Sequence, residues 1–272
     1  MPVWGDIPVW LQALLGAAAV VAGLATLLAL PSVRRRLRDN PRGTMGAAPA
    51  WVLLRALAFG LHRLRVRGRE HVPPVSGRDA HGDPSPGPLI VVMNPAADVD
   101  PLLVQASVPF FVRMMMARDM MVPALGPLWR YGRIIGVDRR GRDGTGPREA
   151  LRHLEAGGAL GVFPEGRLER PARTLLPFAP GVGLMVAKSG ARVLPVVIEG
   201  TPYAKTAFGS LLRPSRSVVT FHPVINYSGG GMSASEIARD LEDRFAAWTG
   251  WPRATRGGAA DAGNAPLSPT VP

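Results

Sequence analysis

The sequence predicts an α/β domain with a mixed, mostly parallel sheet flanked by helices, preceded by an N-terminal membrane helix. Short apolar runs bounded by turn residues alternate with helical segments from residue 89 to residue 222, an order typical of α/β folds. Continuous apolar runs such as Leu89–Met93 are typical of strands buried on both faces. One much longer apolar stretch precedes them near the N-terminus.

That N-terminal stretch, Pro8–Leu30, has only two polar side chains, those of Gln12 and Thr26. As a helix it would rise about 34 Å, which is enough to span a bilayer. A run of arginines at 34–38 follows it, the reverse of the order in a cleavable signal peptide. By the positive-inside rule we expect an uncleaved anchor at residues 1–33, with the rest of the chain on the cytoplasmic side. The alternative is a helix that lies in the membrane interface or packs against the domain.

The formal net charge of +12 calls for an acidic partner: nucleic acid, anionic lipid or a phosphorylated substrate. The arginines after the apolar stretch would meet the anionic leaflet, where each adds about 1 kcal/mol of attraction. Since the sequence holds no nucleic-acid-binding motif, we expect a membrane lipid partner and no nucleic acid. The chain has no cysteine and its five histidines share no ligand spacing, so we expect no metal and no cofactor. The oligomeric state stays open.

Composition divides the rest of the chain into three parts. Residues 34–64 combine a basic linker with an apolar helix, and residues 65–250 form the α/β domain. Residues 251–272 are rich in Gly, Ala and Pro, and we expect them to be a disordered tail.

The apolar helix is predicted at Trp51–Leu64. Arg55, His62 and Arg63 would form a narrow polar stripe along it. Such a helix is either buried in the domain or placed in the membrane interface, and the sequence does not choose between the two.

Within the domain, residues 73–88 are rich in Pro, Gly, Asp and Ser and are expected to form a surface loop. Asp100 stands in the N-cap position of a helix whose first turn contains Pro101. Ser233 and Glu236 fit a capping box. Apolar runs predict strands at 89–93, 134–137, 159–163, 193–198 and 218–222, and periodicity predicts helices at 101–108, 146–156, 181–189 and 233–248.

Four segments carry the candidate chemistry. They are Asn94-Pro95-Ala96-Ala97-Asp98-Val99-Asp100-Pro101, Gly136-Val137-Asp138-Arg139-Arg140-Gly141, Val162-Phe163-Pro164-Glu165-Gly166-Arg167 and Val193-Leu194-Pro195-Val196. In order and spacing they resemble the motif blocks of the glycerolipid (lysophospholipid) acyltransferase family, typified by 1-acylglycerol-3-phosphate acyltransferase. The resemblance covers about residues 65–225.

The resemblance implies transfer of a fatty acyl group from acyl-CoA or acyl-carrier protein to lysophosphatidate or a related lysophospholipid, in phospholipid biosynthesis. In the family a histidine takes the proton of the acceptor hydroxyl, and an aspartate five positions later holds the imidazole. The resemblance also implies that the substrate and its phosphate are held by charge and by backbone N–H groups. The substrate-binding positions it gives are Asn94, Arg139, Glu165, Gly166 and Arg167.

The chain differs from the family at the position of the catalytic general base. Pro95 stands where the family has its histidine, while Asp100 remains at the partner's position. Asp98 and Asp100 are therefore the candidate bases, although an exposed carboxylate titrates near 4 and is a weak base unless its pKa is raised. Alternatively, Asp100 serves only as the N-cap of the following helix.

The phosphate-binding blocks depart as well. Ala179 replaces the usual lysine, and Arg167 precedes by one position the place where the family has its arginine. Arg139 could also be a solvated loop residue. An alternative function follows: a catalytically degraded family member that binds lipid or regulates an active acyltransferase.

Overall fold

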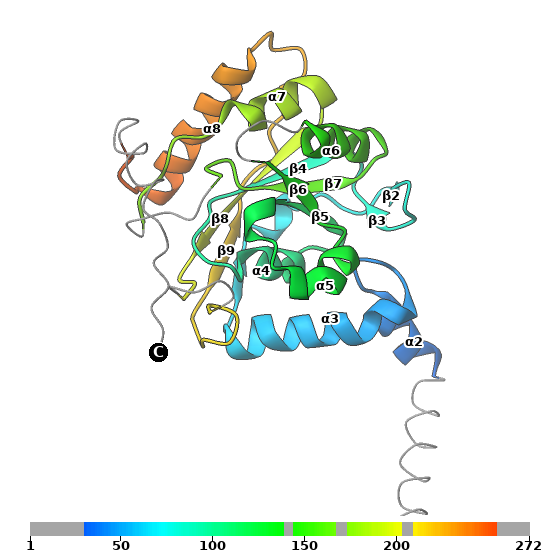
Figure 1. Cartoon of the computed structure of the whole chain (residues 1–272). Helices are drawn as coiled ribbons and strands as arrows, with labels where there is room; N and C mark the ends of the chain where they lie inside the picture. The colour runs from blue at the N-terminus through cyan, green and yellow to red at the C-terminus, as the bar shows by residue number, and fades with distance from the viewer. Residues whose placement is uncertain (1–29, 139–143, 167–172, 203–208, 255–272) are drawn as a thin grey trace, which may run out of the picture.

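The computed structural model describes residues 30–138, 144–166, 173–202 and 209–254 (Figure 1). These residues form a seven-stranded sheet with the strand order β1-β9-β8-β4-β7-β5-β6. Every neighbouring pair is parallel except β8 with β9, which is antiparallel. The expected α/β architecture with a mixed, mostly parallel sheet is therefore confirmed.

The strands of the main sheet are β1 (Arg65–Arg67), β4 (Leu89–Met93), β5 (Val112–Ala117), β6 (Ile135–Val137), β7 (Ala159–Val162), β8 (Arg192–Glu199) and β9 (Val218–Phe221). A separate hairpin pairs β2 (Gly77–Arg78) with β3 (Pro84–Ser85). The α-helices are α2 (Pro31–Arg38), α3 (Ala48–Arg55), α4 (Asp100–Ser107), α5 (Gly126–Tyr131), α6 (Thr145–Glu155), α7 (Pro180–Ser189) and α8 (Ala234–Thr249). The π-helical segment η2 (Ala56–Leu61) continues α3, and short 3-10 turns are η1 (Met45–Ala47), η3 (Arg69–His71), η4 (Arg118–Met120) and η5 (Pro123–Leu125).

The central strand β4 separates two hydrophobic cores. Leu89, Val91 and Met93 pack into the core that includes residues of α4 and η2. Ile90 and Val92 face the core that includes residues of α6, α7 and α8. This alternation is the period of two along a strand. All five side chains are fully buried, and each such burial stabilises the fold by roughly 1.5–3 kcal/mol. Helices therefore cover both faces of the sheet (Figure 1).

The expected strands and helices of the domain occur within one residue of their predicted bounds. The capping box is also confirmed, because Ser233 Oγ accepts the Glu236 N–H at 3.3 Å and Glu236 Oε2 accepts the Ser233 N–H at 2.7 Å. Helix α8 ends at Gly250, whose φ of 65° is the left-handed conformation that glycine adopts readily.

Several elements were not predicted, among them α2, β1 and α5, and two further segments differ from expectation. Strand β5 (Val112–Ala117) carries three consecutive methionines, and methionine gives a weak strand signal compared with β-branched residues. The 73–88 segment is not wholly a loop, because it contains the β2–β3 hairpin.

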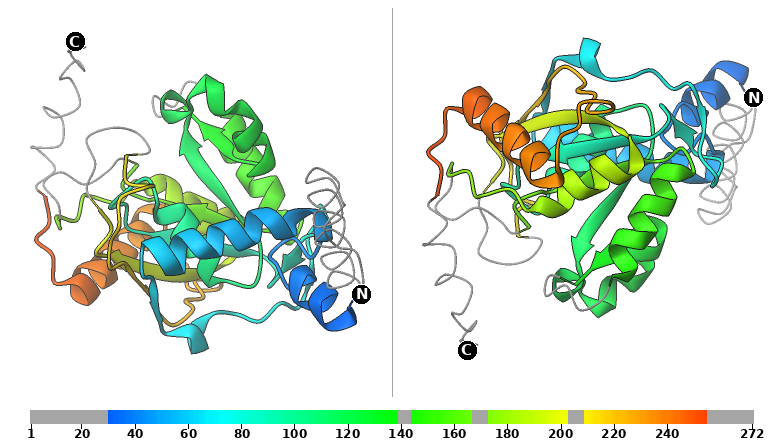
Figure 2. Two further views of the ribbon diagram at one scale, coloured as in Figure 1. Left: turned by 90° about the horizontal axis from the view of Figure 1, so that it is seen from below. Right: turned by 90° about the horizontal axis from the view of Figure 1, so that it is seen from above.

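The predicted polar stripe on the helix at 51–64 is wrong. The helix ends at Leu61, and His62 lies after it, fully buried. Its ring bonds to Ser215 Oγ at 2.9 Å and to the Leu211 carbonyl at 3.0 Å. His62 therefore fixes the 211–215 loop and does not face solvent. On α3 itself two apolar side chains, Val52 and Leu53, are exposed beside the exposed Arg55. Figure 2 (left) shows α3 lying across the lower face of the molecule.

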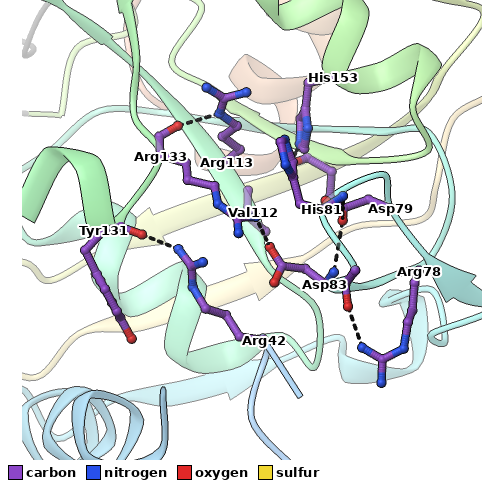
Figure 3. A network of polar contacts seen from close by, with 12 residues as sticks. Arg42, Arg78, Asp79, His81, Asp83, Val112, Arg113, Tyr131, Arg133 and His153 are labelled. Carbon is purple, nitrogen blue, oxygen red and sulfur yellow. Dashed lines mark hydrogen bonds and ion pairs between the residues drawn. The ribbon is translucent and has the colours of Figure 1, made fainter. Parts of the chain in front are cut away.

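A polar network closes the edge of the sheet where β4, β5 and β7 begin (Figure 3). Asp79 Oδ1 accepts the N–H groups of His81 and Asp83, and Asp83 forms an ion pair with Arg133 at 2.5 Å. The His153 ring bonds to the Ala159 carbonyl at 3.1 Å. The Asp83–Arg133 ion pair joins the β2–β3 hairpin to the segment before β6, while the Asp79 bonds order the turn of the hairpin and the His153 bond joins α6 to β7. This network lies at the amino ends of the strands, opposite the edge where the motifs lie.

The predicted membrane helix at 8–30 lies outside the described residues, apart from Leu30. Among the residues that the structure describes, none of the helices is both long and apolar enough to cross a bilayer. The predicted tail at 251–272 is described only to Ala254, and its first residues pair with Leu175 through the Pro252 carbonyl and the Ala254 N–H.

Candidate functional site

Three of the four motif segments meet at one edge of the sheet. Strands β4, β7 and β8 are adjacent and parallel, so their carboxyl ends point the same way. Asn94 follows β4, Glu165 comes three residues after β7, and Thr201 comes two residues after β8. Ligands of open α/β sheets bind at this edge. The edge is therefore the candidate active site.

Asn94 joins two of these strands. Its side-chain amide donates to the Ile198 carbonyl at 2.9 Å, and its Oδ1 accepts the Ile198 N–H at 2.8 Å. The residue is completely buried. Both ends of the amide are therefore used to fix the end of β4 against β8, and this position makes Asn94 a scaffold for the loop that follows.

Asp100 begins α4 and its side chain turns back over the loop. Its Oδ2 accepts the N–H groups of Ala96 and Ala97, each at 2.7 Å. The N-cap of α4 is Val99, and no side chain caps it. The expectation that Asp100 caps this helix is therefore wrong, because its carboxylate bonds to N–H groups that precede the helix.

The Asp100 carboxyl is fully buried. Burial raises its pKa from 3.8 to about 7, and the Asp98 charge adds to this, while the N–H groups of Ala97 and Ala96 and the Thr201 hydroxyl act against it. Among the described residues neither Asp100 Oδ1 nor Thr201 Oγ1 has a hydrogen-bond partner. One carboxyl oxygen is thus fixed, and the other lies buried beside a hydroxyl without a hydrogen-bond partner among the described residues. Thr201 was not predicted as a site residue, because only the pairing of β4 with β8 brings it here.

The other positions of the first motif differ in exposure. Pro95 is buried, and Asp98 is partly exposed. Asp98 lies close enough for its charge to raise the pKa of Asp100. Of the two candidate bases, Asp100 is therefore the one that points into the edge, and Asp98 modulates it.

Glu165 is buried, and its Oε2 accepts the Leu176 N–H at 3.2 Å. Gly166 follows with a φ of +69°, a conformation that side chains rarely adopt. Glu165 borders a cavity of about 570 Å³ between the 176–180 segment and helix α8. The predicted phosphate ligands Arg139 and Arg167 lie outside the described residues.

The comparison with known families decides the assignment. Residues 63–199 match the family model described as Acyltransferase. The chain belongs to this family. The match covers the edge formed by β4, β7 and β8, so membership of the glycerolipid acyltransferase family, expected from the motifs, is confirmed.

This acyltransferase-family chain is similar in structure to the 1-acyl-sn-glycerophosphate acyltransferase PlsC from Thermotoga maritima. The TM-score is 0.57 at 19% sequence identity, over 83% of this chain and 85% of that chain. At this identity the likeness establishes the shared fold. No curated protein matches the chain significantly.

Proposed function

We propose that this family member transfers a fatty acyl group from acyl-CoA or acyl-carrier protein to the hydroxyl of lysophosphatidate or a related lysophospholipid. The proposal follows from the family and from the candidate site at the carboxyl edge of the sheet. It places the reaction in phospholipid biosynthesis, at the cytoplasmic surface of a membrane.

The observation that carries the proposal is the state of Asp100. A general base works best when its pKa lies near the operating pH, and burial raises the pKa of Asp100 to about 7. The N–H groups of Ala96 and Ala97 fix one oxygen, which leaves Oδ1 to accept a proton. Asp100 can therefore act as the general base, a role that Pro95 cannot fill because proline has no titratable group.

The reaction has four balanced movements. Asp100 Oδ1 takes the proton of the acceptor hydroxyl, and the hydroxyl oxygen attacks the thioester carbonyl carbon. The C–S bond breaks as the new C–O ester bond forms. The leaving thiolate then takes the proton from Asp100, which regenerates the carboxylate.

Membrane association is part of the proposal. Exposed apolar patches on soluble domains often mark interaction or membrane surfaces, and here Leu53 is 71% exposed on α3 and Leu212 is 76% exposed. Helix α2 leads into α3 and exposes Arg34 and Arg35, which suit an anionic leaflet. The apolar Pro8–Leu30 segment precedes them directly.

One alternative is favoured by two specific observations. Pro95 removes the family's base, and the Asp100 carboxyl is completely buried, so a substrate hydroxyl reaches it only if the loop opens. A degraded family member that binds lipid, or that regulates an active acyltransferase, would have the same features.

An acyl-transfer assay separates the two functions. The full chain, purified in detergent, is supplied with labelled acyl-CoA and lysophosphatidate, beside an Asp100→Ala variant. Product that appears with the native chain and disappears with the variant supports catalysis by Asp100. Lipid binding without turnover, for every donor and acceptor, supports the alternative.

A further inference from the structure

Two oxygens at the carboxyl edge of the sheet are buried without a hydrogen-bond partner. They are Asp100 Oδ1 and Thr201 Oγ1, and neither is bonded within the described part of the chain. Asp100 is completely buried, while Thr201 is partly exposed although its hydroxyl oxygen is not. Buried polar atoms in folded proteins are nearly always hydrogen-bonded. Two exceptions at one site therefore point to a shared function.

Strand pairing brings these two residues together. Strands β4 and β8 are adjacent and parallel, and Asn94 at the end of β4 bonds to Ile198 of β8 through both ends of its amide. Thr201 follows Ile198 by three residues, and the loop that leads to Asp100 begins at Asn94. The Thr201 hydroxyl is near enough to act on the Asp100 carboxyl, so each oxygen can serve as the partner of the other.

A hydroxyl suits this place because it both donates and accepts hydrogen bonds. It accepts from a protonated carboxyl and donates to an ionised one, and the bond to the ionised form is the stronger of the two. The N–H groups of Ala96 and Ala97 already hold Asp100 Oδ2. A donor on Oδ1 would fix the second oxygen as well and leave one of its lone pairs for the acceptor hydroxyl.

Of the groups around Asp100, Thr201 is the side-chain donor that opposes the effect of burial on its pKa. The hydroxyl lowers the pKa of Asp100, whereas the charge of Asp98 raises it. The facing strand β8 ends in Glu199, which is partly exposed and affects this pKa less than Asp98 does.

The elements packed most closely against α4 add no charge at its start. Segment η2 and strand β9 contain no titratable side chain. Arg55 of α3 bonds to the Ala106 carbonyl at 3.5 Å, near the other end of α4. The ionisation of Asp100 therefore depends on its own loop and on Thr201.

We propose that Thr201 is the positioning residue of the general base: its hydroxyl donates to Oδ1 of the ionised Asp100 carboxylate and directs that oxygen at the acceptor hydroxyl. The inference rests on the proposed acyl-transfer function. Thr201 keeps its own proton throughout. The proton of the acceptor hydroxyl passes to Asp100 Oδ1 and from there to the leaving thiolate.

The first test needs no substrate. Thr201→Val keeps the shape of the side chain and removes the donor, so the folded-state pKa of Asp100 should rise by about one unit. Because the native state holds a proton that the unfolded state releases, stability falls with rising pH until the folded-state pKa is reached. In denaturant unfolding this fall should end near pH 7 for native protein and about one unit higher for Thr201→Val.

Two further variants complete this series. Thr201→Ser retains the hydroxyl and should follow the native curve. Thr220→Val makes the same exchange on β9, where Thr220 pairs with Val197, and should leave the pH dependence unchanged. If Thr201→Val does not fold, Thr201→Ala also lacks the hydroxyl and takes its place.

The second test measures acyl transfer from acyl-CoA to lysophosphatidate by the full chain in detergent. The rate should rise with pH as Asp100 ionises, and in Thr201→Val this rise should move up by about one pH unit. At pH 7 kcat should fall by about fivefold with KM unchanged, and the loss should narrow as the pH increases. A purely structural role for Thr201 would lower the rate equally at every pH.

The outcomes separate this inference from the proposed function. If the stability curves of Thr201→Val and native protein superimpose, or if the variant loses activity equally at every pH, the inference is wrong and acyl transfer still stands. A folded Thr201→Ser variant that behaves like Thr201→Val gives the same conclusion. Absence of product from native protein with every donor and acceptor overturns the inference and the proposed function together.

Discussion

The carboxyl of Asp100 lies beside the hydroxyl of Thr201, at the carboxyl ends of the neighbouring strands β4 and β8. The hydroxyl is near enough to lower the carboxyl's pKa, yet within the described residues neither Asp100 Oδ1 nor Thr201 Oγ1 completes a hydrogen bond. Buried oxygens without partners are costly. The buried Asp100 carboxyl therefore combines an oxygen without a hydrogen-bond partner with a pKa of about 7.

Asp100→Asn should change how stability depends on pH. Burial raises the folded-state pKa from 3.8 to about 7, so between these values the native state holds a proton that the unfolded state releases. Stability should therefore fall as the pH rises from about 4 to about 7, by on the order of 4 kcal/mol. Asparagine does not titrate and should flatten this slope. Denaturant unfolding at a series of pH values measures it, and a native slope of the opposite sign would contradict the assignment.

Pro95→His should create or raise acyltransferase activity. The new imidazole would stand five residues before Asp100, whose free Oδ1 can accept a ring N–H and hold the base. We expect product formation from acyl-CoA and lysophospholipid above the native level. Pro95→Ala serves as the control, because it removes the proline ring without adding a base. A folded Pro95→His variant without turnover would count against an intact site.

Asn94→Ala should act mainly through stability. The substitution leaves the buried N–H and carbonyl of Ile198 without their side-chain partners, at a cost of about 2–4 kcal/mol. Unfolding by denaturant measures this loss. Among the described residues the Asn226 side chain bonds only to the exposed Ser228 N–H, and Asn226→Ala should cost less than about 0.5 kcal/mol. Equal losses in the two variants would show that Asn94 does not join the strands.

Gly183→Ala should loosen the packing of α7 on α8. A Cβ at Gly183 would overlap the backbone carbonyl of Ala234, and the two helices lie side by side (Figure 2, right). We expect the free energy of unfolding to fall by about 1–3 kcal/mol. The position of α8, which forms one wall of the cavity, should also be less firmly fixed. A Cβ at Gly181 meets nothing within 4 Å, so Gly181→Ala in the first turn of the same helix should be neutral or stabilising. Thermal unfolding of both variants decides the matter.

Much of the fold could be read from local pattern. Leu89–Met93 is apolar at every position, and this composition predicts a strand covered on both faces. The Ser233–Glu236 box gave the start of α8, since both of its hydrogen bonds are local. By contrast, Val112–Ala117 could not be recognised as a strand, because its pairing with β6 and β7 decides its conformation more than its methionines do.

The sequence by itself determined the family, the α/β class and the loss of the histidine at Pro95, because each depends on residue identity and spacing along the chain. The tertiary structure decided what Asp100 is: a side chain turned away from its helix cap, with a pKa moved by burial. It also brought Thr201 to Asp100 and helix α8 to the cavity that Glu165 borders. Burial and contacts between distant segments exist only once the strands have paired, and no local pattern encodes them.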